Sequence, residues 1–411
     1  MTRRLLAALS LLVLLLAPAA RASVEEFSSY DLLVMEGDDE NFLDRWLTRV
    51  PNAWDHEFAA APNAFRTSQG CYTSGEWYMR HDLKARATIG KRSYLDIGYL
   101  QVSDDLASWE WLRLDFRWQT QRSGTFGFRF QPSADKSRQD FAALWDWGAP
   151  GELLQVGAAF TLEDAFNTLW EFRQDQVGEH NEPYRAHPVE PALRIASEGK
   201  RHRVELSGKW LTPLRKDIRD PDPSLDGSYS LLGTKAALLA QYTFARWEME
   251  TRFETEHVRS SETSVLLPGD GRNFRRRWLA EAAVRRGFAR RWVAEARGAY
   301  QDRAQHWRPP LGPAAFRALD RGVAAEVAGE LRAGWRMRAG LMHDRVGVAR
   351  RGDPPGFTWG TRRESRAYLG LEARFGRVRV QGIEGIELDN PETYDVSFHH
   401  DKGFLQLQTV F

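Results

Sequence analysis

The sequence contains a single cysteine, Cys71, among 411 residues. It therefore excludes an internal disulfide, and an exported chain of this length must be held together by its core or by a closed ladder of strands. The formal net charge is only +1, which gives no argument for a nucleic-acid partner. Beyond the first 22 residues no long apolar segment follows, so the sequence predicts no membrane-spanning helix.

The first residues have the organisation of a secretory signal. Arg3 and Arg4 give a positive start, the apolar run 5–17 is short for a bilayer span, and Ala20-Arg21-Ala22 fits a small-x-small cleavage site. We therefore expect residues 1–22 to be removed after Ala22. The alternative is a short anchor helix that stays in place. No cysteine follows the run directly, so a lipoprotein is not expected.

The stretch Arg246–His257, RWEMETRFETEH, alternates strictly between two kinds of residue. Charged side chains recur at every second position, with Trp247, Met249 and Phe253 among the residues between them. A helix would scatter both classes around its axis, whereas a strand separates them onto two faces. A single stretch of this kind would suit a half-buried strand of a soluble sheet equally well.

The same alternation recurs along the chain, in WLRLDFRWQ from Trp111, TFGFRFQ from Thr125, HRVELSGKW from His202, GWRMRAGL from Gly334 and AYLGLEARF from Ala367. A soluble sheet would need a second layer to cover so many apolar faces, and the sequence lacks a run of amphipathic helices to supply one. In a membrane barrel the apolar face meets lipid and the charged face lines a wet lumen. The pattern favours the barrel.

The chain ends in GFLQLQTVF, in which Leu405, Leu407 and Phe411 fall on one face. This ending resembles the closing strand of bacterial outer-membrane β-barrels. The resemblance covers the architecture from about Glu76 to Phe411. It implies an integral outer-membrane protein, with barrel-assembly machinery that reads Phe411 and with outer-membrane lipid and lipopolysaccharide as its surroundings.

Turn and loop lengths give a strand count. Tight connections such as Ala333-Gly334 alternate with long ones such as 350–361, as in barrels whose short turns are periplasmic. We predict an all-β, antiparallel transmembrane β-barrel over residues 75–411, with about 18 strands or alternatively 16, and both termini in the periplasm. The first strand is expected at 76–88, one further strand at 164–175 and the last at 403–411.

Residues 23–74 differ from the rest. Asp39 can cap a short helix that runs through Val50, and an irregular stretch follows. We expect a periplasmic or plug segment, with residues 23–74 as the contact for a periplasmic partner. A stretch merely packed against the first strands is an equal alternative.

Charges on the inward faces suggest a function for the lumen. An unpaired, desolvated carboxylate costs several kcal/mol, so inward acids need water or partners. One interpretation is a network of ion pairs within the wall. The other is an acidic wall that faces a basic wall across an open lumen. The predicted lumen-lining acids are Glu248, Glu250, Glu254 and Glu256, and the predicted lumen-lining bases are Arg113, Arg117, Arg129, Arg252, Arg336 and Arg338.

A second group of basic residues lies near the expected outer rim, where lipopolysaccharide phosphates are natural partners. These residues are Arg275, Arg276, Arg277, Arg350, Arg351, Arg362 and Arg363; the alternative is solvated loop charge.

No local motif matches a hydrolase, and His399-His400-Asp401 alone is a weak metal site. We expect no catalytic residues, no metal and no cofactor. The expected function is a channel for polar or charged solutes or an exported polymer. The alternative is a non-conducting scaffold that sheathes or anchors a partner, such as a polysaccharide-export machine or an electron-transfer cytochrome.

Overall fold

The computed structural model describes residue 58 and most of the chain from residue 61 to residue 411. Outside the described part lie 1–57, 59–60, 72–76, 105–107, 121–123, 133–138, 149–152, 163–171, 176–177, 182–183, 187–188, 219–221, 224–225, 265–270, 290, 309–313, 352–360 and 389–401. The predicted signal, the predicted helix from Asp39 to Val50 and the His399–Asp401 cluster fall in these ranges. Within the described part, no helix is long and apolar enough to cross a membrane.

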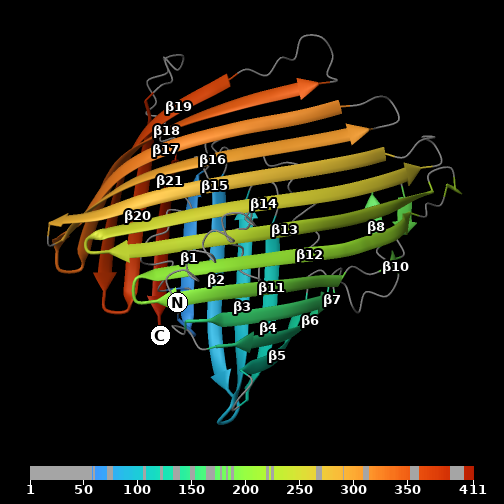
Figure 1. The fold of residues 1–411 in the computed structure, drawn as a ribbon, viewed down its shortest axis with the longest axis horizontal. Helices are drawn as coiled ribbons and strands as arrows, with labels where there is room; N and C mark the ends of the chain where they lie inside the picture. Colours follow the sequence, from blue (N-terminus) through green and yellow to red (C-terminus); the bar gives the residue numbers. More distant parts are fainter. Residues whose placement is uncertain are drawn as a thin grey trace, which may run out of the picture.

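The described chain consists almost entirely of antiparallel strands (Figure 1). Their bounds are β1 Ala64–Cys71, β2 Trp77–Thr88, β3 Ser93–Asp104, β4 Ser108–Gln119, β5 Thr125–Pro132, β6 Gln139–Trp147, β7 Gln155–Leu162, β8 Phe172–Asp175, β9 Gly178–Asn181, β10 Tyr184–Ala186, β11 Val189–Gly199, β12 His202–Ile218, β13 Gly227–Phe244, β14 Trp247–Ser264, β15 Gly271–Ala289, β16 Trp292–Arg308, β17 Ala314–Arg332, β18 Trp335–Arg351, β19 Thr361–Phe375, β20 Val378–Glu387 and β21 Lys402–Val410.

One sheet holds 19 of these strands and closes on itself. β1 pairs with β2 on one side and with β21 on the other, and β7 pairs directly with β11. β10 pairs only with β12, beside the ring, so 18 strands remain in the closed barrel. The predicted fold, an antiparallel barrel of about 18 strands, is confirmed.

Two strand predictions differ from the structure. β1 lies ahead of residue 75, so the barrel begins earlier than expected. The predicted strand at 164–175 does not join the ring: its last residues form β8, which pairs with β9 in a separate two-stranded sheet. Because one strand of the ring was missed and one was predicted in excess, the predicted number of strands is unaffected. β1 was missed because AFRTSQGC carries Thr67 and Gln69 where a lipid-facing strand usually carries apolar residues.

The strands are joined alternately by tight turns and long connections. The turns at Ala245-Arg246, Ala333-Gly334 and Gly376-Arg377 have two residues. Gly334 and Gly376 adopt positive φ angles of 79° and 61°, as two-residue hairpin turns require. These turns share one end of the barrel with the C-terminus, because Val378, the first residue after the Gly376-Arg377 turn, is opposite Thr409 near the end of β21. That end is the periplasmic one in outer-membrane barrels.

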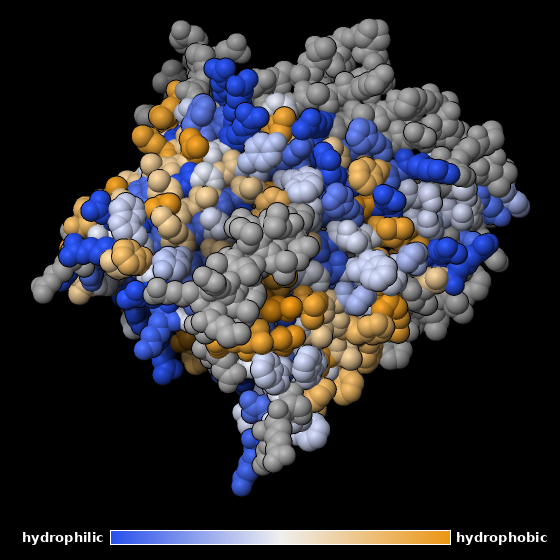
Figure 2. Space-filling view, viewed as in Figure 1, coloured by the Kyte–Doolittle hydropathy of each residue, from blue (hydrophilic) through white to orange (hydrophobic). Residues whose placement is uncertain are grey.

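Side-chain exposure shows that the barrel is inverted relative to a soluble sheet. Along β14, Trp247 and Met249 are 40% and 49% exposed, whereas Glu254 and Glu256 are 2% and 3% exposed. β4 and β5 repeat this with exposed Phe116 and Phe128. Figure 2 shows apolar side chains gathered on the outer surface in the region of β6, β7 and β11. An outward apolar face and an inward charged face define a membrane-spanning barrel.

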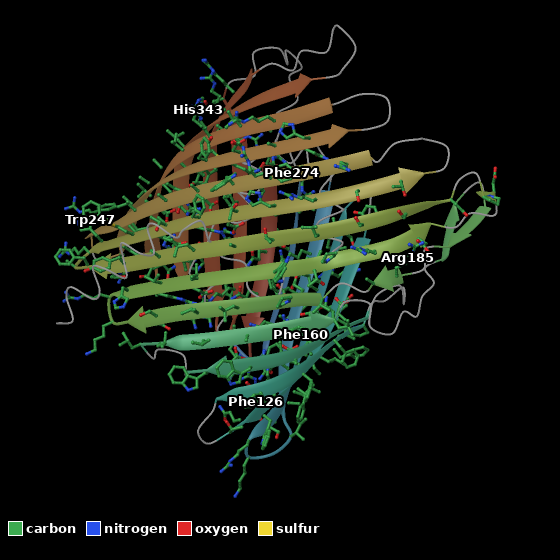
Figure 3. The ribbon with its side chains drawn as sticks, turned by 45° about the vertical axis from the view of Figure 1, so that its right-hand side comes forward. Phe126, Phe160, Arg185, Trp247, Phe274 and His343 are labelled. Atoms are coloured by element: carbon green, nitrogen blue, oxygen red, sulfur yellow. The ribbon has the colours of Figure 1, made fainter. Side chains whose placement is uncertain are left out.

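The outer surface is not apolar throughout. Glu384 on β20 is the cross-strand partner of outward-facing Leu369, so its charged side chain also lies on the outward face. At the turn end, Trp247 projects from the wall (Figure 3), and Arg286 lies 4.8 Å from the centre of its ring. Aromatic and basic side chains at this level are typical of a membrane interface.

The strands of the longest part of the wall exceed the membrane. β12 to β19 have 15 to 19 residues each. A tilted transmembrane strand needs about 9–11 residues. Counted from the tight turns, about 4 to 10 residues at the far end of each of these strands therefore extend beyond the hydrocarbon core, on the side of the long connections.

Candidate functional site: the inner wall of the barrel

The acidic residues of β14 face the lumen and are paired within the wall. Glu248 and Glu250 both approach the Nη1 atom of Arg285 on β15, at 2.9 and 3.5 Å. These two strands lie side by side, with Glu248 directly opposite Arg285. The first half of the acidic face is therefore partly compensated by one arginine of the next strand.

The second half of the β14 face is paired in the same way. Glu254 accepts hydrogen bonds from Arg252 on its own strand and from Nη2 of Arg277 on β15, the latter at 2.9 Å. Glu256 contacts Arg275 of β15 at 3.1 Å. The structure thus shows the ion-pair network, one of the two interpretations of these acids.

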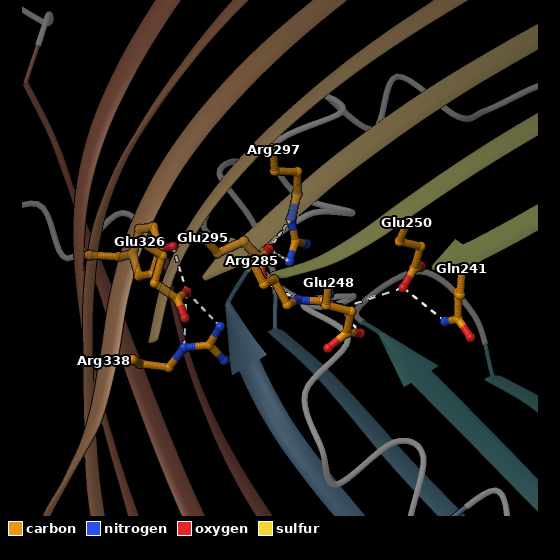
Figure 4. A network of polar contacts seen from close by, with 9 residues as sticks. Gln241, Glu248, Glu250, Arg285, Glu295, Arg297, Glu326 and Arg338 are labelled. Atoms are coloured by element: carbon orange, nitrogen blue, oxygen red, sulfur yellow. Dashed lines mark hydrogen bonds and ion pairs between the residues drawn. The ribbon is translucent and has the colours of Figure 1, made fainter. Parts of the chain in front are cut away.

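The network continues around the inner wall (Figure 4). Arg285 also donates to Glu295 on β16 at 2.5 Å, and Arg297 donates to the same carboxylate. Further on, Arg338 of β18 donates through Nε and Nη2 to Oε2 of Glu326 on β17, at 3.1 and 2.5 Å. The Tyr368 hydroxyl of β19 donates to that same oxygen at 2.7 Å. Inward polar groups thus join β14 to β16 in one cluster and β17 to β19 in a second.

A cavity opens among these groups at the turn end. It has a volume of about 370 Å³ and is lined by charged side chains of both signs from β14 to β19. Glu248 is its most accessible acid, with a side chain 43% exposed. Arg336, predicted to line the lumen, also lines this cavity and lies 4.0 Å from Glu372. The arrangement can receive a hydrated, polar molecule and offers it both kinds of charge.

The basic residues of β4 and β5 also face inward but surround one acid. Arg129 donates through Nε and Nη2 to the two oxygens of Asp115, at 2.8 and 2.7 Å. Arg117 and Arg113 lie 3.4 and 3.8 Å from the same carboxylate. Arg117 also pairs with Asp146 of β6. The basic wall is therefore partly compensated by its own acids.

The placement of these bases differs from the prediction. β4 is the fourth strand of the ring, one place later than a count from the expected first strand at 76–88 gives, because β1 precedes it. It lies seven places from β14, the eleventh strand, rather than opposite it. Arg252 and Arg338 pair with Glu254 and Glu326 in their own part of the wall. Each predicted lumen base has an acid of its own wall within 4.0 Å.

One arc of the inner wall is closed to solvent. Arg366, Gln381 and Gln408 of β19 to β21 are at most 1% exposed, and Asp344 of β18 is equally buried. Barrels of 16 to 18 strands commonly leave an aqueous channel, whose wall would be wet. These four inward side chains are therefore covered by other parts of the chain and do not face open water.

The chain ahead of β1 reaches this inner wall. The carbonyl oxygen of Phe58 accepts a hydrogen bond from Lys84 of β2 at 3.1 Å. Its ring lies 4.4 Å from the guanidinium of Arg66, which pairs with inward-facing Asp82. Phe58 therefore lies on the inner side of the wall, which fits both a plug and a stretch packed against the first strands.

The predicted outer-rim arginines divide between the two faces. Arg275 and Arg277 point inward to Glu256 and Glu254. Arg276 points outward and lies 3.8 Å from Asp302. Arg363 is outward and exposed, whereas the side chains of Arg350, Arg351 and Arg362 lie outside the described part. Further outward arginines of the described strands near this rim, which the sequence pattern did not single out, include Arg259, Arg272, Arg317, Arg321 and Arg345.

No protein-family model and no curated protein matches the chain. Solved structures with a similar fold are outer-membrane proteins. A loop-deletion mutant of OmpT, an outer membrane protein of Vibrio cholerae, is 12% identical, with a TM-score of 0.38 over 84% of this chain and 96% of that one. OccK2 of Pseudomonas aeruginosa, solved with glucuronate, is 11% identical, with a TM-score of 0.41 over 85% and 98%. CdiB from Acinetobacter baumannii is 10% identical, with a TM-score of 0.43 over 84% and 59%. Because these TM-scores lie below 0.5, the fold assignment rests on the strand pairing itself.

Proposed function

We propose that the chain is an integral protein of the bacterial outer membrane that passes polar or charged material along its inner wall. The supporting observation is the ionic inner face, which extends from Glu248 to Glu256 on β14 and continues across β15 to β19. Charged side chains inside a barrel cost free energy unless they are hydrated or paired. A water-filled route for polar solutes explains why a chain would carry them there. The proposal includes no catalytic step, and both termini lie in the periplasm.

A second candidate, a scaffold that sheathes or anchors a partner, is favoured by a different observation. The inward side chains of Arg366, Gln381 and Gln408 are closed to water, which a conducting pore would not need. In this proposal a periplasmic partner would contact the stretch 23–74, part of which enters the barrel at Phe58.

Conductance separates the two candidates, and two adjacent arginines supply a matched pair of variants. Arg285 faces the lumen and holds Glu248, Glu250 and Glu295, whereas Arg286 faces outward beside Trp247. In planar bilayers the wild-type chain should give discrete current steps. Arg285→Gln removes the one inward positive charge shared by three carboxylates, of which Glu295 keeps Arg297, so its reversal potential in a salt gradient should shift toward cation selectivity.

Arg286→Gln is the control, because it removes the same charge from the lipid side of the same strand. Its reversal potential should match that of the wild type. Equal shifts in both variants would contradict a route along the inner wall. Folded but silent wild-type protein, recovered together with a partner, would favour the scaffold.

Phe411 is proposed as the signal for barrel assembly. Its backbone N–H donates to the Asn63 carbonyl at 3.2 Å, and its side chain is 56% exposed. Truncating an exposed side chain should change the unfolding free energy by less than about 0.5 kcal/mol. Phe411→Ala should nevertheless lower the amount of barrel inserted in cells several-fold, measured by the heat-dependent gel mobility of membrane fractions.

The control for this experiment is Phe244→Ala, which truncates a 57% exposed aromatic near the same end of the barrel. Insertion of that variant should stay near the wild-type level. Equal losses in the two variants would show that aromatic residues at this end act by membrane anchoring alone.

A further inference from the structure

Three arginines form a row across the outer surface of the barrel. Arg321 of β17 is the direct cross-strand partner of Arg345 of β18, which is in turn the partner of Arg363 of β19. All three side chains are exposed and share the outward face with Leu341 and Leu369. Since neighbouring strands lie about 4.8 Å apart, the row spans about 10 Å.

The row lies at the membrane interface on the side of the long connections. Arg345 follows Trp335, the first residue of β18 after its tight turn, by ten positions. Arg321 and Arg363 lie at comparable distances from the turn ends of β17 and β19. A tilted strand crosses the hydrocarbon in about 9–11 residues. The three guanidinium groups therefore stand at the level of the outer-leaflet headgroups.

Like charges directly opposite each other destabilise an antiparallel sheet. Among the outward neighbours of the row in the described structure are Tyr300, whose ring is 5.7 Å from Arg321, and the pair His343 and Ser365 on the side of the tight turns. None of these three carries a negative charge at neutral pH. The nearest outward acid along β16 is Asp302, which is diagonal to Arg321 and pairs with Arg317 and Arg276 instead. His343, labelled in Figure 3, is the next outward residue toward the turn end of β18.

Two other outward arginines of the same surface have an acid close by. Arg317 donates through Nε and Nη2 to Asp302 at 3.1 and 2.9 Å, and Arg276 lies 3.8 Å from that carboxylate. The outer surface can therefore neutralise arginines from within. The described structure shows no such acid for the row, so its stabilisation calls for anions from outside the chain.

We propose that Arg321, Arg345 and Arg363 bind the phosphate groups of an outer-leaflet lipid, the phosphorylated glucosamine end of lipopolysaccharide. Guanidinium groups bind phosphate through paired hydrogen bonds, and their placement at headgroup depth selects a lipid phosphate over a free one. Leu341 and Leu369, nearer the turn ends of β18 and β19, provide the apolar surface for the acyl chains.

The experiment measures binding of lipid A by the detergent-purified full chain, using native mass spectrometry. The probes are lipid A with both phosphates, dephosphorylated lipid A and inorganic phosphate. The wild type should bind the bisphosphorylated lipid at least tenfold more tightly than the dephosphorylated one. The triple variant Arg321→Gln, Arg345→Gln, Arg363→Gln should lose at least tenfold of that affinity.

The control variant, Arg286→Gln, Arg291→Gln, Arg332→Gln, removes three exposed arginines from the tight-turn end, and it should bind like the wild type. Thermal unfolding supplies a second measurement. Without lipid the row variant should melt no lower than the wild type, because like-charge repulsion has been removed. With lipid A only the wild type and the control should gain stability. Equal losses in both triple variants, equal binding of dephosphorylated lipid, or competition by millimolar inorganic phosphate would each overturn the proposal.

Discussion

Leu341→Arg is expected to lower the unfolding free energy of the bilayer-embedded chain by about 2–4 kcal/mol, as arginine on the lipid face of a barrel does at the midplane. Leu341 lies six residues beyond Trp335, near the middle of the span, and its side chain is 59% exposed. In a soluble protein the same change at so exposed a position would cost less than about 0.5 kcal/mol. Denaturant titration of the protein refolded into lipid vesicles, followed by tryptophan fluorescence, measures the difference.

The control is Phe375→Arg, at the tight-turn end of β19, where the side chain is 57% exposed. At the interface an arginine costs only about 0–1 kcal/mol. A large loss of unfolding free energy in Leu341→Arg together with a small loss in Phe375→Arg would mean that the middle of the wall contacts the hydrocarbon of the bilayer. Equal, small penalties at both positions would mean that the apolar stripe faces water or another protein.

The barrel could be predicted because its signal is local and repeated. Alternation within RWEMETRFETEH separates an apolar face from a charged face even when the neighbouring strands are unknown. Because many strands show this pattern, the apolar faces can be assigned to lipid and the charged faces to the lumen. β1 could not be found in this way. Its outward positions include Thr67 and Gln69, and its place is fixed by pairing with β21, which lies more than 300 residues later in the chain.

The rim arginines show where single-strand reasoning could have gone further. Three consecutive residues of a strand cannot share a face, so Arg276 had to point away from Arg275 and Arg277. Outward Trp278 in the same strand identifies which face each one takes. The row of Arg321, Arg345 and Arg363 was beyond reach, because it depends on the register of three strands joined by loops of different length.

Asp115→Asn is expected to be the most destabilising single change in the inner wall, by about 3–5 kcal/mol, because it leaves buried guanidinium groups without their counter-charge. Asp115 is 2% exposed and receives two hydrogen bonds from Arg129, with Arg113 and Arg117 also within 4 Å. The substitution keeps the shape of the side chain and removes its charge only. The measurement is again denaturant unfolding in vesicles.

Asp146→Asn is the control, since this acid pairs with the same Arg117 but its side chain is 47% exposed. Water screens that pair, so its loss should cost less than about 1 kcal/mol. Adding Arg129→Met to Asp115→Asn should recover part of the stability, because one uncompensated charge is then gone. Under conditions where the Asp115→Asn barrel still folds, its current should shift toward anion selectivity, opposite in sign to Arg285→Gln. If Asp115→Asn were as mild as Asp146→Asn, water would reach this carboxylate, and the charges on β4 would line an open lumen.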